Sequence, residues 1–193
     1  METLIAALLG FLMGSIPFGL LLTRAAGLGD VRDIGSGSIG ATNVLRTGNK
    51  GLAAATVLLD AAKGAIPVLL AAHFWPGTEG LMAIAAVAGH CFTPWLRFKG
   101  GKGFATAAGV LLALAWPVML VCAAIWAATL ALSRISSVSS LTTVIAAPVA
   151  AWLMGYPQVV LPLIGIAVIV IFQHRANIGR LRRGEEPRVG SKK

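Results

Sequence analysis

Apolar stretches long enough to cross a bilayer recur along the chain, and this recurrence constrains its fold more than any other feature. A hydrocarbon core of ~30 Å takes about 20 helical residues to span. Of the 193 residues, 57% are hydrophobic and only 12% are charged, against about 25% charged in an ordinary globular domain. The sequence therefore predicts an all-α integral membrane protein and excludes a soluble domain. The expected apolar segments are Leu4–Thr23, Gly51–Trp75, Gly80–Leu96, Phe104–Ala115, Pro117–Leu132, Leu141–Met154 and Gln158–Gln173.

The number of spans depends on two long apolar stretches, Phe104–Leu132 and Leu141–Gln173. Each is too long for one upright helix and short for two. Trp116–Pro117 and residues 155–157 interrupt them near the middle, and both sites couple an interfacial aromatic residue to a helix-ending proline. We expect two hairpins, which gives seven transmembrane helices, with five as the alternative.

Positive charge gives the orientation, because cytoplasmic loops carry the excess of lysine and arginine. In the seven-span arrangement all 16 of these residues fall on one face or at its edge, and the other face keeps Glu2 and Glu79. A five-span arrangement would send Arg134 to the far side. The sequence thus predicts an external N-terminus and a cytoplasmic C-terminus, in one membrane domain over residues 1–193 with a short basic tail at 175–193.

Several other classes are excluded on composition. The net charge of +9 accompanies apolar spans, so it does not indicate a nucleic-acid partner. Cys91 and Cys122 lie inside apolar sequence without metal-type spacing, which favours small packing residues and predicts no metal site. The run Leu4–Leu22 lacks a basic start and a cleavage site, so we expect it to remain as the first span.

The first cytoplasmic loop, residues 33–46, is rich in glycine and small hydroxyls and ends at Arg46. Gly35-x-Gly37-x-x-Gly40 matches the dinucleotide fingerprint, but no strand-helix-strand unit surrounds it, so we reject that interpretation. Glycine amides, hydroxyls and a guanidinium would suit a phosphate. A flexible loop that only permits tight helix packing is an equally good interpretation of the residues alone.

A second loop carries Gly100-Gly101-Lys102-Gly103 and leads directly into the next apolar segment. Free amides and the positive end of a helix dipole would meet an anion there, beside the lysine. It is not a Walker A loop, because Phe104 follows the last glycine. A simple positive anchor at the membrane needs no glycines, so anion binding is favoured.

Three further groups of polar residues stand out. The serines of the expected loop Ser133–Ser140 are typical of close helix packing in membranes. Residues 180–183 are basic and suit anionic lipid headgroups, while His174 and Asn177 are three apart, would share a helical face and could hold a polar ligand. Asp60 and Lys63, at i, i+3 within an apolar run, predict a structural ion pair.

Three motifs together resemble the bacterial acyl-phosphate-dependent glycerol-3-phosphate acyltransferases. They are Gly-Ser-Gly-x-x-Gly-Ala-Thr-Asn at 35–43, Gly-His-x-x-x-Pro with Phe-Lys-Gly-Gly-Lys-Gly at 89–103, and His-Arg-x-Asn-Ile at 174–178. The similarity covers the whole chain in order and spacing. One departure is Ile135-Ser136-Ser137-Val138, where the family has an aromatic-Val-Ser-Leu run, so Ser140 matches a family serine and Ser137 is left without a role.

The resemblance implies an enzyme of the bacterial inner membrane with its active site on the cytoplasmic face. Such an enzyme moves a fatty acyl group from acyl phosphate to the sn-1 hydroxyl of glycerol 3-phosphate, giving lysophosphatidic acid and phosphate in the first acylation step of phospholipid synthesis. It also implies no acyl carrier protein or acyl-CoA donor, no cofactor and no metal. Membrane lipid would be the remaining partner.

The residues agree with this chemistry. The chain lacks the His-x-x-x-x-Asp pair of other glycerolipid acyltransferases and has no Gly-x-Ser-x-Gly elbow, so the donor has to bring its own activation, as a mixed anhydride does. We expect direct attack of the acceptor hydroxyl on the acyl carbon, with the proton passing to a donor phosphate oxygen. The alternative mechanism makes His174 a general base.

The expected site consists of residues from all three motifs, with the loop that binds each phosphate left open. A transporter of phosphorylated metabolites is the alternative function, although transporters place substrate groups near the midplane and this charge lies at one face. The expected catalytic residues are Ser36, Arg46, Lys102, His174 and Asn177. The expected phosphate-binding residues are Gly37, Ser38, Thr42, Asn43, Gly100, Gly101, Gly103 and Ser140.

Overall fold

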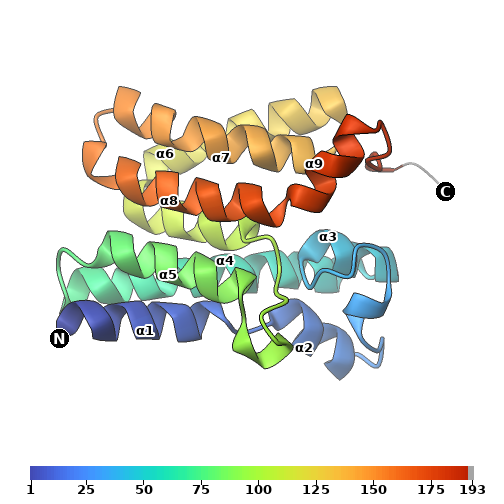
Figure 1. The fold of residues 1–193 in the computed structure, drawn as a ribbon, viewed down its shortest axis with the longest axis horizontal. Helices are drawn as coiled ribbons and strands as arrows, with labels where there is room; N and C mark the ends of the chain where they lie inside the picture. Colours follow the sequence, from blue (N-terminus) through green and yellow to red (C-terminus); the bar gives the residue numbers. More distant parts are fainter. Residues whose placement is uncertain (191–193) are drawn as a thin grey trace.

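The computed structural model describes residues 1–190, and all regular elements in this part are helices (Figure 1). Of the predicted basic tail, residues 191–193 lie outside the described part. Three of the elements are short 3-10 helices. The elements are α1 (Glu2–Gly14), α2 (Phe18–Ala25), η1 (Val31–Asp33), α3 (Ala41–Val44), η2 (Leu45–Thr47), α4 (Lys50–Phe74), α5 (Glu79–Cys91), η3 (Pro94–Leu96), α6 (Phe104–Ser133), α7 (Ser136–Leu153), α8 (Pro157–Gln173) and α9 (Arg175–Arg182).

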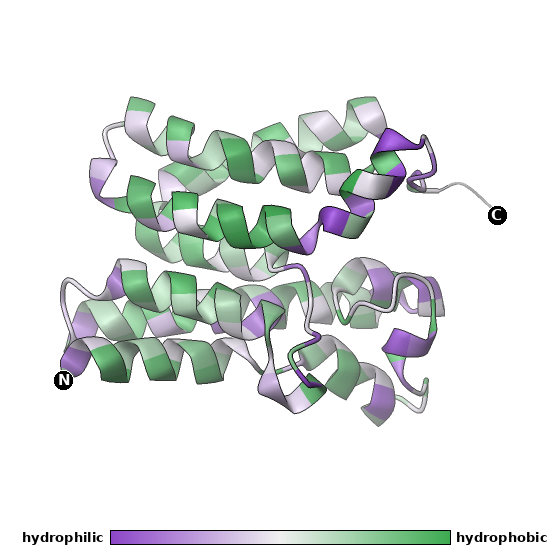
Figure 2. Ribbon diagram, viewed as in Figure 1, coloured by the Kyte–Doolittle hydropathy of each residue, from purple (hydrophilic) through white to green (hydrophobic). Residues whose placement is uncertain are grey.

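The long helices form a bundle with a common direction, and its outer surface is apolar. Four segments are long and apolar enough to cross a membrane, namely Glu2–Ala25, α4, α6 and α7, and α8 with α9 makes a fifth if that bent pair is one span. Large side chains such as Leu58 (70% exposed) and Leu161 (75% exposed) point outward, as expected when lipid is the solvent. Figure 2 shows apolar residues along the helices and a concentration of polar residues at the end that carries α2, α3 and α9.

The first apolar run is broken, whereas the sequence suggested one continuous helix. α1 ends at Gly14 and α2 begins at Phe18. Pro17 is the cause, since proline lacks a backbone N–H and its ring clashes with the preceding helical turn. The break exposes the carbonyl of Ile16, which accepts a hydrogen bond of 2.6 Å from Lys63 Nζ.

α6 folds back on itself. The rings of Phe104 and Trp126 stack with centroids 6.2 Å apart, although a straight helix would separate residues 104 and 126 by about 33 Å. The backbone leaves helical geometry at Ala115 (φ −159°, ψ 77°), two residues before Pro117. The second half of α6 consequently returns beside α7, as Figure 1 shows.

Two expected boundaries are wrong. α5 ends at Cys91 and not at Leu96, because Thr93 is extended before Pro94, as the residue before a proline usually is. α7 begins at Ser136, so most of the expected serine loop is the first turns of a helix. At the end of α8, which closely matches its expected range, the chain bends by 60° into α9.

Close backbone contact joins α4 to the first half of α6. A Cβ on Gly109 would lie 1.9 Å from the Ala61 carbonyl oxygen, and one on Gly64 would lie 2.2 Å from that of Thr106. Small residues permit such approach between membrane helices. Beside this contact Asp60 and Lys63 form the ion pair that the sequence predicted, with 2.8 Å between Oδ1 and Nζ.

Candidate active site

Asn43 closes the first glycine-rich loop. Its side chain is 2% exposed, and its Oδ1 accepts hydrogen bonds from the Ser36 amide (3.0 Å) and from Arg46 Nη1 (3.3 Å). Because its polar atoms are engaged within the loop, Asn43 fixes the loop's shape and aims Arg46. Its Nδ2 donates to the backbone carbonyls of Val31, Ile34 and Ser38.

The same loop needs glycine where Arg46 crosses it. Gly35 has φ +55°, and a Cβ there would lie 2.0 Å from Arg46 Nη1, so any side chain would displace the guanidinium. Ser36, Gly37 and Thr42 are exposed. The amides of Ser36 and Gly37 donate to Asn43 Oδ1 and to the Ile34 carbonyl. The hydroxyls of Ser36 and Thr42 are therefore the groups accessible to a ligand at the polar end of the bundle.

The second loop presents Lys102 at the start of α6. Gly100 and Gly101 donate their amides to the carbonyls of Cys91 and His90, each at 3.1 Å. Gly103 precedes the helix with φ +82°. Burial, reinforced by the positive charges of nearby arginines, lowers the pKa of Lys102 to about 8. The ammonium is thus charged at neutral pH but poorly solvated, which favours an anionic partner.

A carboxylate from the C-terminal tail connects the remaining elements. The Glu186 side chain is 6% exposed and accepts hydrogen bonds from Ser137 Oγ (2.6 Å), Asn177 Nδ2 and Arg180 Nε (2.6 Å). Burial alone would raise the pKa of Glu186, but these three hydrogen bonds outweigh it and lower the pKa. The charges of Glu186 and Lys102 also act on each other.

His174 lies where α8 bends into α9, and it is 2% exposed. Its Nδ1 is 2.8 Å from the Val170 carbonyl oxygen, and since a carbonyl can only accept, Nδ1 carries the proton. Burial lowers the pKa of His174 to about 4. The imidazole is therefore neutral at physiological pH, and its Nε2 lone pair is available to accept a hydrogen bond.

The structure brings Arg46, Lys102, His174 and Asn177 to one end of the bundle, around Glu186. Ser140 is buried on α7, three residues after Ser137 and hence on the same helical face. The first loop joins this group through Arg46, and Ser36, Gly37 and Thr42 are exposed in it whereas Ser38 is half-buried. Gly100, Gly101 and Gly103 shape the backbone on either side of Lys102.

Sequence reasoning missed Glu186 and Ser137, and it considered Arg180 only as part of a segment that binds lipid headgroups. The tail was interpreted by its arginines alone. The available signal was the pair of acidic residues, Glu185 and Glu186, in an otherwise basic segment. In the structure Arg180 pairs with Glu186.

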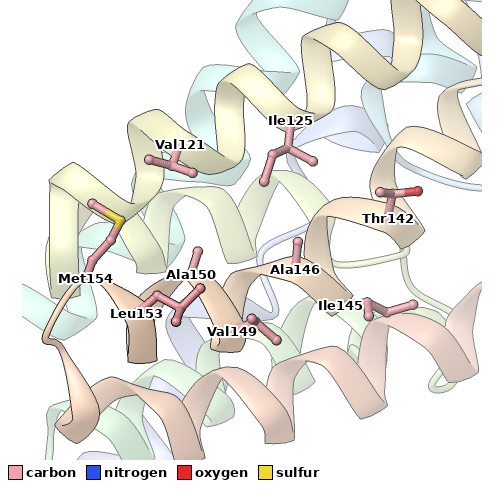
Figure 3. A pocket seen from close by; sticks show the side chains of 9 residues that line it. All are labelled: Val121, Ile125, Thr142, Ile145, Ala146, Val149, Ala150, Leu153 and Met154. Carbon is pink, nitrogen blue, oxygen red and sulfur yellow. The ribbon is translucent and has the colours of Figure 1, made fainter.

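An apolar groove of about 670 Å³ opens between the second half of α6 and α7 (Figure 3). Its site-proximal end is at Thr142, two residues after Ser140, and it extends along α7 toward Met154. A groove of this kind suits a hydrocarbon chain whose polar head lies among the cations. It is lined by Val121, Ile125, Thr142, Ile145, Ala146, Val149, Ala150, Leu153 and Met154.

Comparison with known proteins finds relatives along nearly the whole chain. A family model described as glycerol-3-phosphate acyltransferase matches residues 4–184. The glycerol-3-phosphate acyltransferase of Erythrobacter litoralis is 61% identical over 188 residues, which is 97% of this chain and 95% of the relative. That of Mesorhizobium japonicum is 56% identical, covering 98% of this chain and 97% of the relative.

Solved structures give the same answer for the fold. Two crystal structures of PlsY (YgiH), an integral membrane glycerol 3-phosphate acyltransferase, superpose with TM-scores of 0.92 for the glycerol 3-phosphate form and 0.91 for the lysophosphatidic acid form. They are 36% and 35% identical to this chain, and each match covers 98% of this chain and 96% of the solved chain. The chain belongs to the glycerol-3-phosphate acyltransferase family.

Proposed function

We propose that this protein transfers a fatty acyl group from acyl phosphate to the sn-1 hydroxyl of glycerol 3-phosphate, releasing lysophosphatidic acid and phosphate. The observation that carries the proposal is the convergence of Arg46, Lys102 and Arg180 at the polar end of the bundle, next to an apolar groove. Both substrates carry phosphate, and only one carries a long hydrocarbon chain. A cationic cluster beside a groove open toward lipid suits that pair.

Two phosphate subsites follow from the positions of the cations. The exposed hydroxyls of the first loop, with Arg46, would hold one phosphate, and Lys102 with Ser140 and Asn177 would hold the other. The relatives' names and the ligand forms of PlsY support glycerol 3-phosphate as acceptor and lysophosphatidic acid as product. The acyl chain would lie in the groove along α7.

The mechanism is direct transfer. The acceptor hydroxyl attacks the acyl carbon, a new ester C–O bond forms, the bond between acyl carbon and phosphate oxygen breaks, and the hydroxyl proton passes to the departing phosphate. Nε2 of His174 accepts a hydrogen bond from the acceptor's other hydroxyl and so orients the acceptor, which leaves the attacking hydroxyl's proton free to pass to the phosphate. A pKa near 4 makes His174 a weak general base at neutral pH, because effective catalytic bases have pKa values near the working pH.

We infer seven transmembrane helices in the bacterial inner membrane, with the N-terminus outside and the site facing the cytoplasm. The reversal of α6 supports this topology, as does the position of Arg134, whose carbonyl accepts a 2.7 Å hydrogen bond from the Val189 amide beside the site. Arg134 therefore lies at the same end of the bundle as Lys102. The positive-inside rule assigns that end to the cytoplasm.

A donor comparison tests the proposed reaction. Purified protein in detergent is given glycerol 3-phosphate with the same acyl chain presented as acyl phosphate, acyl-CoA or acyl carrier protein. We expect lysophosphatidic acid from acyl phosphate alone. Equal use of a thioester would contradict the proposed donor, and glycerol 3-phosphate flux through sealed vesicles without acyl product would favour a transporter.

A further inference from the structure

A cluster of ionisable side chains lies buried beneath the second loop, and the reaction proposed above does not use it. Asp60 and Lys63 of α4 pair at 2.8 Å, and both side chains are 3% exposed. Nδ1 of His90, near the end of α5, lies 3.7 Å from Asp60 Oδ1, which is beyond hydrogen-bond distance and makes the contact electrostatic. Charges placed in a membrane segment are costly and are usually functional.

The His90 side of this cluster contacts the loop that carries Lys102. The backbone carbonyl of His90 accepts from the Gly101 amide at 3.1 Å. The imidazole also fills the space beside Gly101, because a Cβ there would lie 2.0 Å from His90 Nε2. A shift of the His90 ring would therefore move the glycine turn that immediately precedes Lys102.

The Lys63 side of the cluster connects to the break between α1 and α2. Lys63 Nζ donates to the Ile16 carbonyl at 2.6 Å. From the same break, the carbonyl and hydroxyl of Ser15 accept from Thr93 Oγ1 (2.7 Å) and Trp95 Nε1 (2.8 Å). The cluster and these two bonds thus join α4, the break between α1 and α2, and the segment that follows α5, all at the base of the loop.

The loop itself needs such support. Arg97 and Phe98 adopt φ values of +53° and +61°, a left-handed conformation that side-chain-bearing residues rarely take. Strained backbone of this kind persists only where the surrounding structure holds it in place. Apolar residues at positions 60 and 63 could pack α4 against its neighbours without the cost of burying charge. The presence of ionic groups there therefore indicates that the loop must be held in one defined conformation.

We propose that Asp60, Lys63 and His90 are positioning residues, which hold the Gly100–Lys102 turn so that the Lys102 ammonium meets the substrate phosphate. They act through Lys102 and do not touch substrate. The inference rests on the proposed role of Lys102 in phosphate binding.

A double-mutant cycle tests the coupling. The neutral replacement Asp60→Leu with Lys63→Met keeps the buried volume apolar, and we expect folded protein whose kcat/KM falls about tenfold. In the Lys102→Ala background the same replacement should cost less than about twofold, because the group it positions is absent. The thermal unfolding midpoint of each protein is measured as well: an unchanged midpoint with reduced kcat/KM indicates a displaced Lys102, whereas a large drop in the midpoint indicates loss of the fold.

Two further variants keep the test decisive. His90→Asn leaves the Asp60–Lys63 pair in place but removes the ring beside Gly101, so it should give the same non-additive pattern if the apolar pair fails to fold. Thr56→Val, a buried change one turn before Asp60 in α4, should leave kcat/KM unchanged in both backgrounds. If the replacements lower kcat/KM equally with and without Lys102, or do not lower it at all, the positioning role is overturned. If Lys102→Ala alone leaves kcat/KM unaffected, the proposed phosphate ligand is refuted instead.

Discussion

At the scale of single residues, the environment of Lys102 makes its charge both useful and sensitive to pH. Lys102→Ala should lower turnover at least tenfold, which corresponds to ~1.4 kcal/mol. Because the folded pKa is lowered to about 8, the free enzyme loses this charge above pH 8, and KM for the phosphate substrate should rise there. Lys102→Arg should remove that rise, since a guanidinium stays protonated. Exposed Lys99 provides the control, and equal losses in Lys99→Ala and Lys102→Ala would disprove the assignment.

His174 separates the two mechanisms. If it only orients the acceptor, His174→Asn should keep a measurable fraction of the rate, because an amide can still accept one hydrogen bond. If His174 is the general base, the same substitution should lower the rate by about 10²- to 10⁴-fold. With a folded pKa of about 4, His174 stays neutral through pH 5 to 8, so its protonation should reduce the rate only near pH 4 and below. A nearly inactive mutant whose acid limb has disappeared would make His174 the base.

Glu186 should be essential for the shape of the site. Glu186→Gln weakens three hydrogen bonds to a charged acceptor, each worth about 1.5–3 kcal/mol in general, so both the thermal midpoint and the activity should drop. Its pKa is lowered in the folded state, hence this stabilisation is present at neutral pH and is lost as the pH falls through that lowered value.

The neighbouring carboxylate supplies a matched control for Glu186. Glu185 is 55% exposed and pairs with Arg183, and exposed pairs contribute little. Glu185→Gln should therefore behave like the wild type. Equal behaviour of the two variants would show that Glu186 has no special place in the site.

The sequence could single out Arg46, Lys102, His174 and Asn177, which the structure brings to one end of the bundle, because cationic and polar residues in basic loops point to anion chemistry. Glu186 could not be predicted, since its role depends on contact with Ser137, 49 positions away in the chain. Asn43 was expected to bind phosphate, but only the folded loop reveals that its amide groups are used internally.

At the scale of elements, apolar runs predicted where the helices lie, whereas prolines and the residues before them determine where several helices end. The reversal in α6 was predictable from Trp116–Pro117, and the break at Ala115 lies one residue before it. The break between α1 and α2 was not predicted, although Pro17 signals it, because the apolar run continues without interruption. The early end of α5 likewise depends on Pro94 and its effect on Thr93.

Topology can be measured at the turn between α6 and α7. In a protein with Cys91→Ala and Cys122→Ala, a cysteine replacing Arg134 should react only with reagents that enter the cytoplasm. A cysteine replacing the exposed Pro76, at the opposite turn between α4 and α5, should react from outside. Labelling of position 134 from outside intact cells would refute the seven-span arrangement.

At the scale of the whole molecule, the bundle has one polar end that suits contact with water and an apolar outer surface that suits contact with lipid. In the proposed reaction the water-soluble substrate would reach the cations from the polar end, and the acyl chain would approach from lipid along the groove between α6 and α7 (Figure 3). The overall all-α membrane class followed from hydropathy, and the groove required the packing of two helix faces that sequence alone does not bring together.

The most direct test of the proposed function is a product balance on the purified protein. Acyl phosphate and glycerol 3-phosphate are supplied together, and inorganic phosphate and lysophosphatidic acid are both quantified over time. We predict that the two products appear in equal amounts, only when both substrates are present, and at least tenfold more slowly with Lys102→Ala. Release of phosphate from acyl phosphate without glycerol 3-phosphate, or without matching lysophosphatidic acid, would contradict acyl transfer as the function of this site.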